Sequence, residues 1–221
     1  MKRLIVLSVP VVLSLFLFGC TQLAGSAEPQ PSACRNHRYF PLRLGAHWEY
    51  LWESDFPGSI SEIERYEVTE LNVDHGTTAE RRVWLALPPL DIPEENSEVP
   101  FRCYDTGITT PLGVGYMPYD LTRGLAWSDP FSTQEVREEL QAADNLATIT
   151  VPAGTFEALC ITIKWTSPSS PSPDSYYPSS GQSCYAEGIG LVYEEYTAIR
   201  PRDGDTTNDA LRLVSYTIPA Q

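Results

Sequence analysis

The sequence lacks the motifs on which most enzyme active sites and metal sites depend. It contains no G-x-S-x-G nucleophile elbow, no phosphate-binding P-loop and no H-E-x-x-H motif. Its three histidines, His37, His47 and His75, are scattered, and no Cys-x-x-Cys pair is present, so zinc binding is not expected. We therefore predict no catalytic, cofactor-binding or metal-binding residue, and a hydrolase is the least supported function.

Acidic residues do occur in pairs and clusters, but their spacing does not fit a known site. Adjacent residues of a strand point to opposite faces, so Glu94–Glu95, Glu138–Glu139 and Glu194–Glu195 cannot flank one glycosidic bond. The segment 202–209, "RDGDTTND", has oxygen ligands suitable for calcium but lacks the EF-hand spacing and its distal Glu. Because Asp-Gly is a strong turn signal, we interpret this segment as a hairpin turn.

Positive charge is also scarce. The formal net charge of the 221 residues is -14, and after residue 19 only one lysine, Lys164, remains. Loss of residues 1–19 would remove Lys2 and Arg3 and no acid, which takes the formal charge to about -16. Such a surface repels nucleic acid and anionic lipid head groups, so no nucleic-acid partner is expected.

Only one long hydrophobic run is present, at the N-terminus. Leu4 to Phe18 would span about 22 Å as a helix, which is short for a hydrocarbon core of about 30 Å. A charged start, a short apolar middle and a small-residue exit are typical of an export signal. The four residues that end this run, "LFGC", resemble the lipobox of bacterial lipoproteins, although Phe18 is bulkier than the residue usual there. The alternative is an ordinary secretory signal cleaved nearer "AGSAEP".

The lipobox resemblance implies a lipid anchor. It makes Cys20 the lipidated residue, modified by diacylglycerol and by acyl chains such as palmitate, with 1–19 as the cleaved signal peptide. The membrane is then a partner through the lipid on Cys20. The chain would be exported to the bacterial cell envelope. Since Thr21 follows the cysteine, it would reach the outer membrane if the organism has one, and otherwise the outer face of the plasma membrane.

The remaining four cysteines form an even set, which in an exported chain suggests two disulfides. Three connectivities exist, and we favour Cys34–Cys103 and Cys160–Cys184. The second pair would join two neighbouring strands across a loop. Four unpaired thiols are the alternative, because export allows oxidation without requiring it.

The rest of the chain reads as a tether, 20–36, followed by a single β domain, 37–221. Segments of period-2 hydrophobic alternation separated by turn residues predict an antiparallel meander, and nineteen prolines argue against long helices. The expected strands lie within 48–53, 61–71, 77–87, 101–108, 147–151, 155–165, 183–199 and 210–219. The expected loops and turns are 88–100, 109–124, 166–182 and 200–209.

Residues 133–142 present a conflict between local and long-range signals. Ser132 and Glu135 form a capping box, and the residues after them are good helix formers, which predicts a helix. The turn chemistry needed to end such a helix is weak, and the segment lies among strands. We predict a strand, and a helix that covers an open apolar groove is the alternative.

Three motifs together resemble a family of uncharacterised bacterial exported lipoproteins: "YFPLRLGAHWEY", "TVPAGTFEALCITI" and "CYAEGIGLVYEE". The resemblance, from about Tyr39 to Tyr196, implies a strongly curved antiparallel sheet, such as a half-barrel or barrel-like meander, with few or no helices after the signal peptide. In the proteins that the chain resembles, the segment before "VPAGTF" is a strand, which supports the strand predicted for residues 133–142. The motif residues have structural roles in turns and close approaches: Pro152, Gly154, Phe156, Gly188 and Gly190.

Two functions follow as expectations. In the first, the chain is a lipid-anchored, non-catalytic envelope or cell-surface protein that binds an apolar ligand or a protein partner. In the second, it is a structural component of an envelope assembly. A continuous apolar groove would favour the first function, and a filled core would favour the second.

Overall fold

The computed structural model describes residues 37–56, 58–59, 61–71, 75–84, 95–110, 112–130, 137–166, 177–200 and 202–220. Within these ranges the chain forms thirteen strands and no helix, which confirms the predicted mainly β class. The strands are β1 His47–Ser54, β2 Glu62–Leu71, β3 His75–Trp84, β4 Glu95–Arg102, β5 Gly107–Thr109, β6 Tyr116–Pro118, β7 Ala126–Ser128, β8 Arg137–Ala142, β9 Ala147–Val151, β10 Gly154–Thr166, β11 Tyr177–Ala186, β12 Gly190–Arg200 and β13 Asp205–Thr217.

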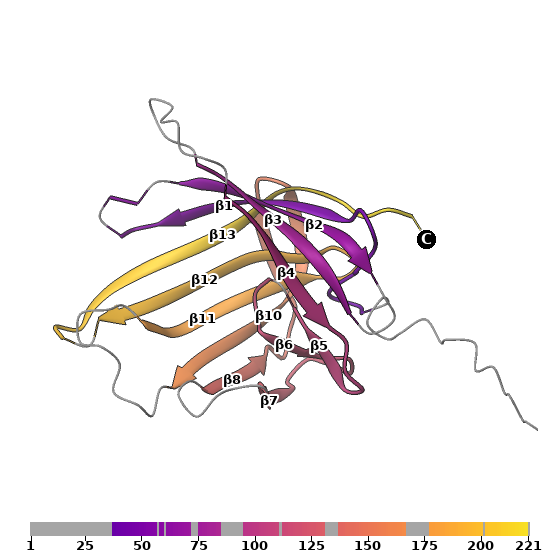
Figure 1. Ribbon diagram of the computed structural model, residues 1–221. Coiled ribbons are helices and arrows are strands. Elements are labelled where there is room, and N and C mark those ends of the chain that lie inside the picture. Colours follow the sequence, from indigo (N-terminus) through magenta and orange to yellow (C-terminus); the bar gives the residue numbers. More distant parts are fainter. Residues whose placement is uncertain are drawn as a thin grey trace, which may run out of the picture.

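Eleven of these strands form one antiparallel sheet. Its order is β4-β3-β2-β1-β13-β12-β11-β10-β8-β7, and β9 pairs with β10 off this path. The first and last strands of the domain, β1 and β13, are neighbours, and they join an N-terminal meander to a C-terminal one. Figure 1 shows the sheet strongly twisted, with β3 and β4 running at a steep angle to β11–β13. The described edge strands, β4 and β7, do not pair with each other, so the sheet is curled but not closed into a barrel.

No helix of the described residues is long and apolar enough to span a membrane.

One face of the sheet, the inner face, carries the hydrophobic core. Along β1 the side chains of Trp48 and Tyr50 are buried while their neighbours are more exposed, as period-2 alternation requires. Segments outside the main sheet complete this core: Phe40 and Leu42 from the residues before β1, and Met117 from β6.

Buried aromatic side chains hold distant parts of the inner face together through hydrogen bonds. Trp48 Nε1 donates to the carbonyl of Ile189 at 2.7 Å, and the Tyr50 hydroxyl donates to the carbonyl of Leu191 at 2.9 Å. Because β13 lies between β1 and β12 in the sheet, both bonds reach past a strand. Tyr185 extends the arrangement, since its hydroxyl accepts from the backbone N–H of Val114 at 2.9 Å.

The "VPAGTF" motif forms the predicted strand, turn and strand. Pro152 and Ala153 make the turn between β9 and β10, and Gly154 has a φ of 139°. The Ala153 N–H donates to the Leu213 carbonyl at 3.1 Å, and the Phe156 ring lies 6.2 Å from that of Tyr216. The hairpin tip therefore contacts β13, although β11 and β12 separate β10 from β13 in the sheet.

The glycines of the closing motif allow the close approach that the sequence predicted. Gly188 has a φ of 72°, and its N–H donates to the Arg38 carbonyl at 2.8 Å. A Cβ on Gly190 would lie 3.4 Å from Trp48 Nε1, so the indole packs directly against the turn between β11 and β12.

All four predicted loops or turns are wrong in part. Residues 116–118 of the predicted loop 109–124 form β6, which pairs with β5. Residues 95–100 of the predicted loop 88–100 belong to β4, an edge strand, where Pro100 is tolerated. Residues 177–182 belong to β11; Gly181, a loop signal by sequence, lies where a Cβ would meet the Glu195 carbonyl at 2.8 Å. The predicted turn 200–209 includes the observed turn 202–204, but residues 205–209 belong to β13 and pair with β12.

The structure decides between strand and helix for residues 137–142. Residues 137–142 form β8, which pairs with residues 161–166 of β10 and extends the sheet. The strand prediction is confirmed there, and these residues form no helical lid. Residues 133–136 lie outside the described residues.

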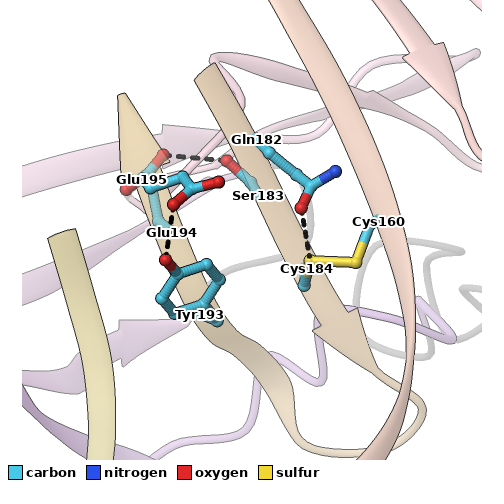
Figure 2. Close-up of a disulfide and its surroundings, with 7 residues drawn as sticks. All are labelled: Cys160, Gln182, Ser183, Cys184, Tyr193, Glu194 and Glu195. Atoms are coloured by element: carbon cyan, nitrogen blue, oxygen red, sulfur yellow. Dashed lines mark hydrogen bonds between the residues drawn. A yellow bond between two sulfur atoms is a disulfide. The ribbon is translucent and has the colours of Figure 1, made fainter. Parts of the chain in front are cut away.

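The structure also confirms one predicted disulfide. Cys160 and Cys184 are bonded and lie directly opposite each other on β10 and β11 (Figure 2). Cys103 is disulfide-bonded as well. Its predicted partner Cys34 lies outside the described residues, as does Cys20, so that pairing and the lipidation stay predictions.

We expect the Cys160–Cys184 bond to stabilise the domain. It closes a loop with a sequence separation of 24, for which restriction of the unfolded chain predicts about 3 kcal/mol. Urea unfolding of the Cys160→Ala/Cys184→Ala double variant should show a loss of that order. A double variant as stable as wild type would contradict the expectation. In wild type, non-reducing peptide mapping should recover the Cys160 and Cys184 peptides as one disulfide-linked species.

The Tyr50 hydrogen bond gives a second test of the fold. In Tyr50→Phe the Leu191 carbonyl loses its donor in a buried site, so the free energy of unfolding should fall by about 1–3 kcal/mol. Tyr216→Phe is the matched control; Tyr216 is 37% exposed, and its change should stay within about 0.5 kcal/mol. If both variants lose the same free energy of unfolding in urea, the Tyr50 hydrogen bond contributes no more to stability than the exposed hydroxyl of Tyr216 does.

Candidate functional site

The other face of the sheet, the outer face, carries a groove of about 650 Å³. Five strands, β1 and β10 to β13, supply its lining. Gln182 on β11, Glu195 on β12 and Arg212 on β13 occupy alternate positions that point outward, whereas Asp209 lies on the buried side of β13 with Leu211. We call this the outer groove, and its lining is Glu53, Ser54, Asp55, Thr162, Ser180, Gly181, Gln182, Tyr193, Glu195, Tyr196, Thr197, Asn208, Asp209, Ala210 and Arg212.

A second hollow of about 510 Å³ adjoins the outer groove. Thr162 lines both, so the two hollows meet at β10. The second hollow extends over β8 and β7 and includes Trp127, Glu139 and Lys164. Together they follow the outer face from β1 to β7.

Hydrogen bonds fix the side chains at the centre of the outer groove. The Tyr193 hydroxyl donates to Glu195 Oε2 at 2.6 Å (Figure 2). Partial burial, with this acceptor, raises the pKa of Tyr193 to about 12, so the phenol keeps its proton. Across the groove, Arg212 forms an ion pair with Glu53 of β1.

One end of the outer groove is held by Asp55. Its carboxylate accepts from the Asn208 backbone N–H at 2.7 Å, the Asn208 amide at 2.8 Å and the Thr207 hydroxyl at 2.8 Å. These bonds, led by that from the Asn208 backbone, lower the pKa of Asp55. Asp55 therefore fastens the end of β1 to β13 and keeps its charge.

The inner face carries a separate cluster of acids and tyrosines around Glu194. Its carboxylate accepts from the Ser183 hydroxyl at 2.8 Å (Figure 2). Burial raises the pKa of Glu194 to about 7, the Ser183 bond opposes the rise, and the nearby carboxylates of Glu64 and Glu138 add to it. Glu194 can therefore exchange a proton near neutral pH.

The other members of this cluster are held by their own contacts. Glu64 is buried and accepts from the Tyr66 hydroxyl at 2.8 Å. Glu138 accepts from Trp165 Nε1 at 2.8 Å, and burial raises its pKa. Burial also raises the pKa of Tyr50 well above its usual value, since the phenol lies deep in the core.

His37 has contacts that hold the chain before β1 in place. His37 is buried; its Nδ1 accepts from the Tyr39 N–H at 3.2 Å, and its Nε2 lies 3.1 Å from the Pro118 carbonyl. Burial lowers the pKa of His37, which favours the neutral ring with the proton on Nε2. His37 thus fastens the residues before β1 to β6. The side chain of His75 lies outside the described part of the chain.

Two of the three acidic pairs behave as predicted, and Glu94 of the third lies outside the described residues. Glu194 bonds Ser183 on the inner face while Glu195 accepts from Tyr193 in the outer groove, and in β8 Glu138 is half-buried while Glu139 is exposed. In the segment 202–209, which was predicted to be a turn, Asp203 and Asp205 form ion pairs with Arg200. Within the described ranges no three histidine, cysteine or acidic side chains are grouped so that they could hold a metal ion.

Sequence reasoning missed both the outer groove and the Glu194 cluster. The available signal was alternation in β12, which places Glu194 on the same side as Val192 and Ala198, both buried. A carboxyl among buried residues of one strand face marks an unusual environment. The groove had no such signal, because its lining comes from strands far apart in the sequence.

Comparison with known proteins gives limited information. No protein-family model and no curated protein matches the chain. Two solved structures are similar. One is a "putative lipoprotein" from Parabacteroides distasonis, with 15% identity, 83% of this chain and 99% of that chain covered, and a TM-score of 0.44. The other is a "putative exported protein with YmcC-like fold" from Bacteroides fragilis, with 14% identity, 82% and 100% covered, and a TM-score of 0.47. At TM-scores below 0.5 neither similarity establishes a shared fold or function.

The raised pKa of Glu194 predicts a pH-dependent stability. The folded state holds the proton up to about pH 7, whereas the unfolded chain releases it near its ordinary value of about 4.3. The stabilisation is complete below the unfolded value and is lost as the pH rises through 7. Between about pH 5 and 8, Glu194→Gln should gain about 2–3 kcal/mol relative to wild type.

Glu195→Gln is the matched control for this measurement, because it removes the same charge from the neighbouring exposed residue. Its stability difference from wild type should stay nearly constant over the same pH range. Urea unfolding at several pH values distinguishes the two variants. Parallel pH profiles for Glu194→Gln and wild type would show that Glu194 titrates normally.

Proposed function

We propose that this chain is a lipid-anchored, non-catalytic protein of the bacterial cell envelope that binds a protein partner through the outer groove. The lipobox resemblance at Cys20 supports export and anchoring. The observation that carries the binding role is the outer groove itself, a hollow of about 650 Å³ lined by hydrogen-bonding side chains of five paired strands. A site on paired strands is more precisely held than one on loops.

The lining of the groove favours a protein partner over an apolar ligand. Small-molecule sites for apolar ligands are mostly lined by hydrophobic side chains, whereas this groove presents carboxylates, amides, hydroxyls and a guanidinium. On the inner face the large side chains of Phe40, Trp48 and Tyr50 are buried and pack into one cluster. Residues 137–142 add a strand to the sheet and do not cover an opening as a helix.

A structural role in an envelope assembly is the alternative. It would use the open edges of the sheet, where unpaired backbone groups can add strands from another chain. The edge strand β4 carries an exposed Glu98 and Pro100, and both residue types disfavour such pairing. The outer groove is therefore the better supported interaction surface.

Anchoring also limits where the partner lies. The predicted tether, 20–36, cannot exceed about 60 Å when fully extended. The proposed partner is consequently a protein of the same membrane or one that reaches the domain within that distance.

Site-specific photo-crosslinking in intact cells tests the proposal. A photoreactive residue at Thr162, which is exposed and lines both hollows, should give a discrete protein adduct in the membrane fraction. The same residue at Thr148, exposed on β9 outside both hollows, is the control and should give none. Cys20→Ser should abolish incorporation of a fatty-acid probe and release the protein from the membrane.

Two results would contradict the proposal. Wild-type protein that never incorporates the fatty-acid probe would refute the anchor. Equal adducts at Thr162 and Thr148, or none at either, would refute the outer groove as the binding surface.

A further inference from the structure

We infer that the outer groove takes an extended peptide segment rich in lysine or arginine, supplied by the partner protein. This inference deepens the proposed function and rests on it. Three acids of the lining, Glu53, Asp55 and Glu195, lie on its outer side, and Arg212 is its one base. The fourth acid, Asp209, shares the buried side of β13 with Leu211. The outer side of the lining thus has a formal charge of -2, and the whole chain has one of -14. A cationic segment complements both charges.

The contacts in the groove show which charges a ligand would meet. Arg212 is neutralised by its ion pair with Glu53. Asp55 is engaged by three hydrogen bonds from β13, and Asp209 is buried. Asp55 and Glu195 are the exposed acids of the lining, and Glu195 lies on β12, the middle of the five strands, with its carboxylate oriented by the Tyr193 hydroxyl at 2.6 Å. The geometry assigns Glu195 as the centre of the cation site.

The dimensions of the groove fit an extended segment. Its lining runs from Glu53 on β1 to Thr162 on β10, and the five strands are separated by four inter-strand spacings. At about 4.8 Å each, these spacings give a length of roughly 19 Å. An extended chain of about six residues covers that distance.

The surroundings supply uncharged hydrogen-bonding groups along the same path. Gln182 on β11 and Thr197 on β12 flank Glu195, and Thr162 leads into the second hollow. These groups can satisfy backbone amides of the segment between its cationic side chains. Since the lining lies on paired strands, little ordering of the protein is needed for binding.

Fluorescence anisotropy with a labelled hexapeptide of alternating lysine and serine tests the inference. The full-length lipoprotein in a non-ionic detergent is titrated at low salt, beside a glutamate-serine hexapeptide. The lysine peptide should bind, and the glutamate peptide should not. Glu195→Gln should weaken binding about threefold to fivefold, as loss of one partly exposed charge pair does, and Glu195→Lys should weaken it about tenfold or more.

Glu98→Gln is the matched control for non-specific attraction, because it removes the same charge from an exposed position on β4, far along the sheet from the groove. The affinity of Glu98→Gln for the lysine peptide should stay within about 1.5-fold of the wild-type affinity, since only the overall charge of the protein changes. Equal losses in Glu98→Gln and Glu195→Gln would overturn the inference, because the attraction would then be diffuse. Displacement of the lysine peptide by the neutral sugar maltohexaose would also overturn it, in favour of a polyhydroxyl ligand.

The outcome separates this inference from the proposed function. A specific adduct at Thr162 without lysine-peptide binding would leave the partner role intact and exclude a cationic segment. Binding of the lysine peptide that depends on Glu195 supports the cationic segment, and loss of both signals would refute the groove as a protein-binding surface.

Discussion

Two hydrogen bonds from the first strand to the turn between β11 and β12 fix the curl of the sheet. Trp48 and Tyr50 donate to the carbonyls of Ile189 and Leu191, which lie beyond β13. Both donors are buried, and the Tyr50 bond is buried at both ends, so its loss would leave the Leu191 carbonyl without a donor. The two bonds lie beside the pairing of β1 with β13. Every outward side chain of these strands, and therefore the shape of the outer groove, follows from this packing.

Adjacent residues of one strand face opposite sides of the sheet, and their side chains therefore have different environments. Glu194 lies inside, where burial raises its pKa to about 7, and Glu195 lies outside, where it accepts a hydrogen bond from Tyr193. The inner carboxyl can be neutral near physiological pH, and this limits the cost of burying it. The outer carboxylate remains available to a cationic partner. Alternation along β12 thus separates a group that affects stability from one that affects recognition.

Local patterns in the sequence predicted much of the fold. Alternation identified β1, β2, β10 and most of β13, and the even set of cysteines, with two on neighbouring expected strands, predicted the Cys160–Cys184 bond. Local rules failed where long-range pairing decides the structure. Residues 95–100 and 177–182 look like loops because of their proline, serine and glycine, yet their neighbours in the sheet make them strands. The pairing of β1 with β13 had no local signal. The outer groove could not be predicted for the same reason, since it requires that pairing.

If the outer, polar face binds the partner, the packed inner face carries no apolar ligand. Mass spectrometry of small molecules that co-purify with the Cys20→Ser protein, prepared without detergent, distinguishes the two faces. We expect no apolar molecule in stoichiometric amount. One equivalent of a fatty acid or lipid, whose removal destabilises the domain, would contradict it and move the binding site to the inner face.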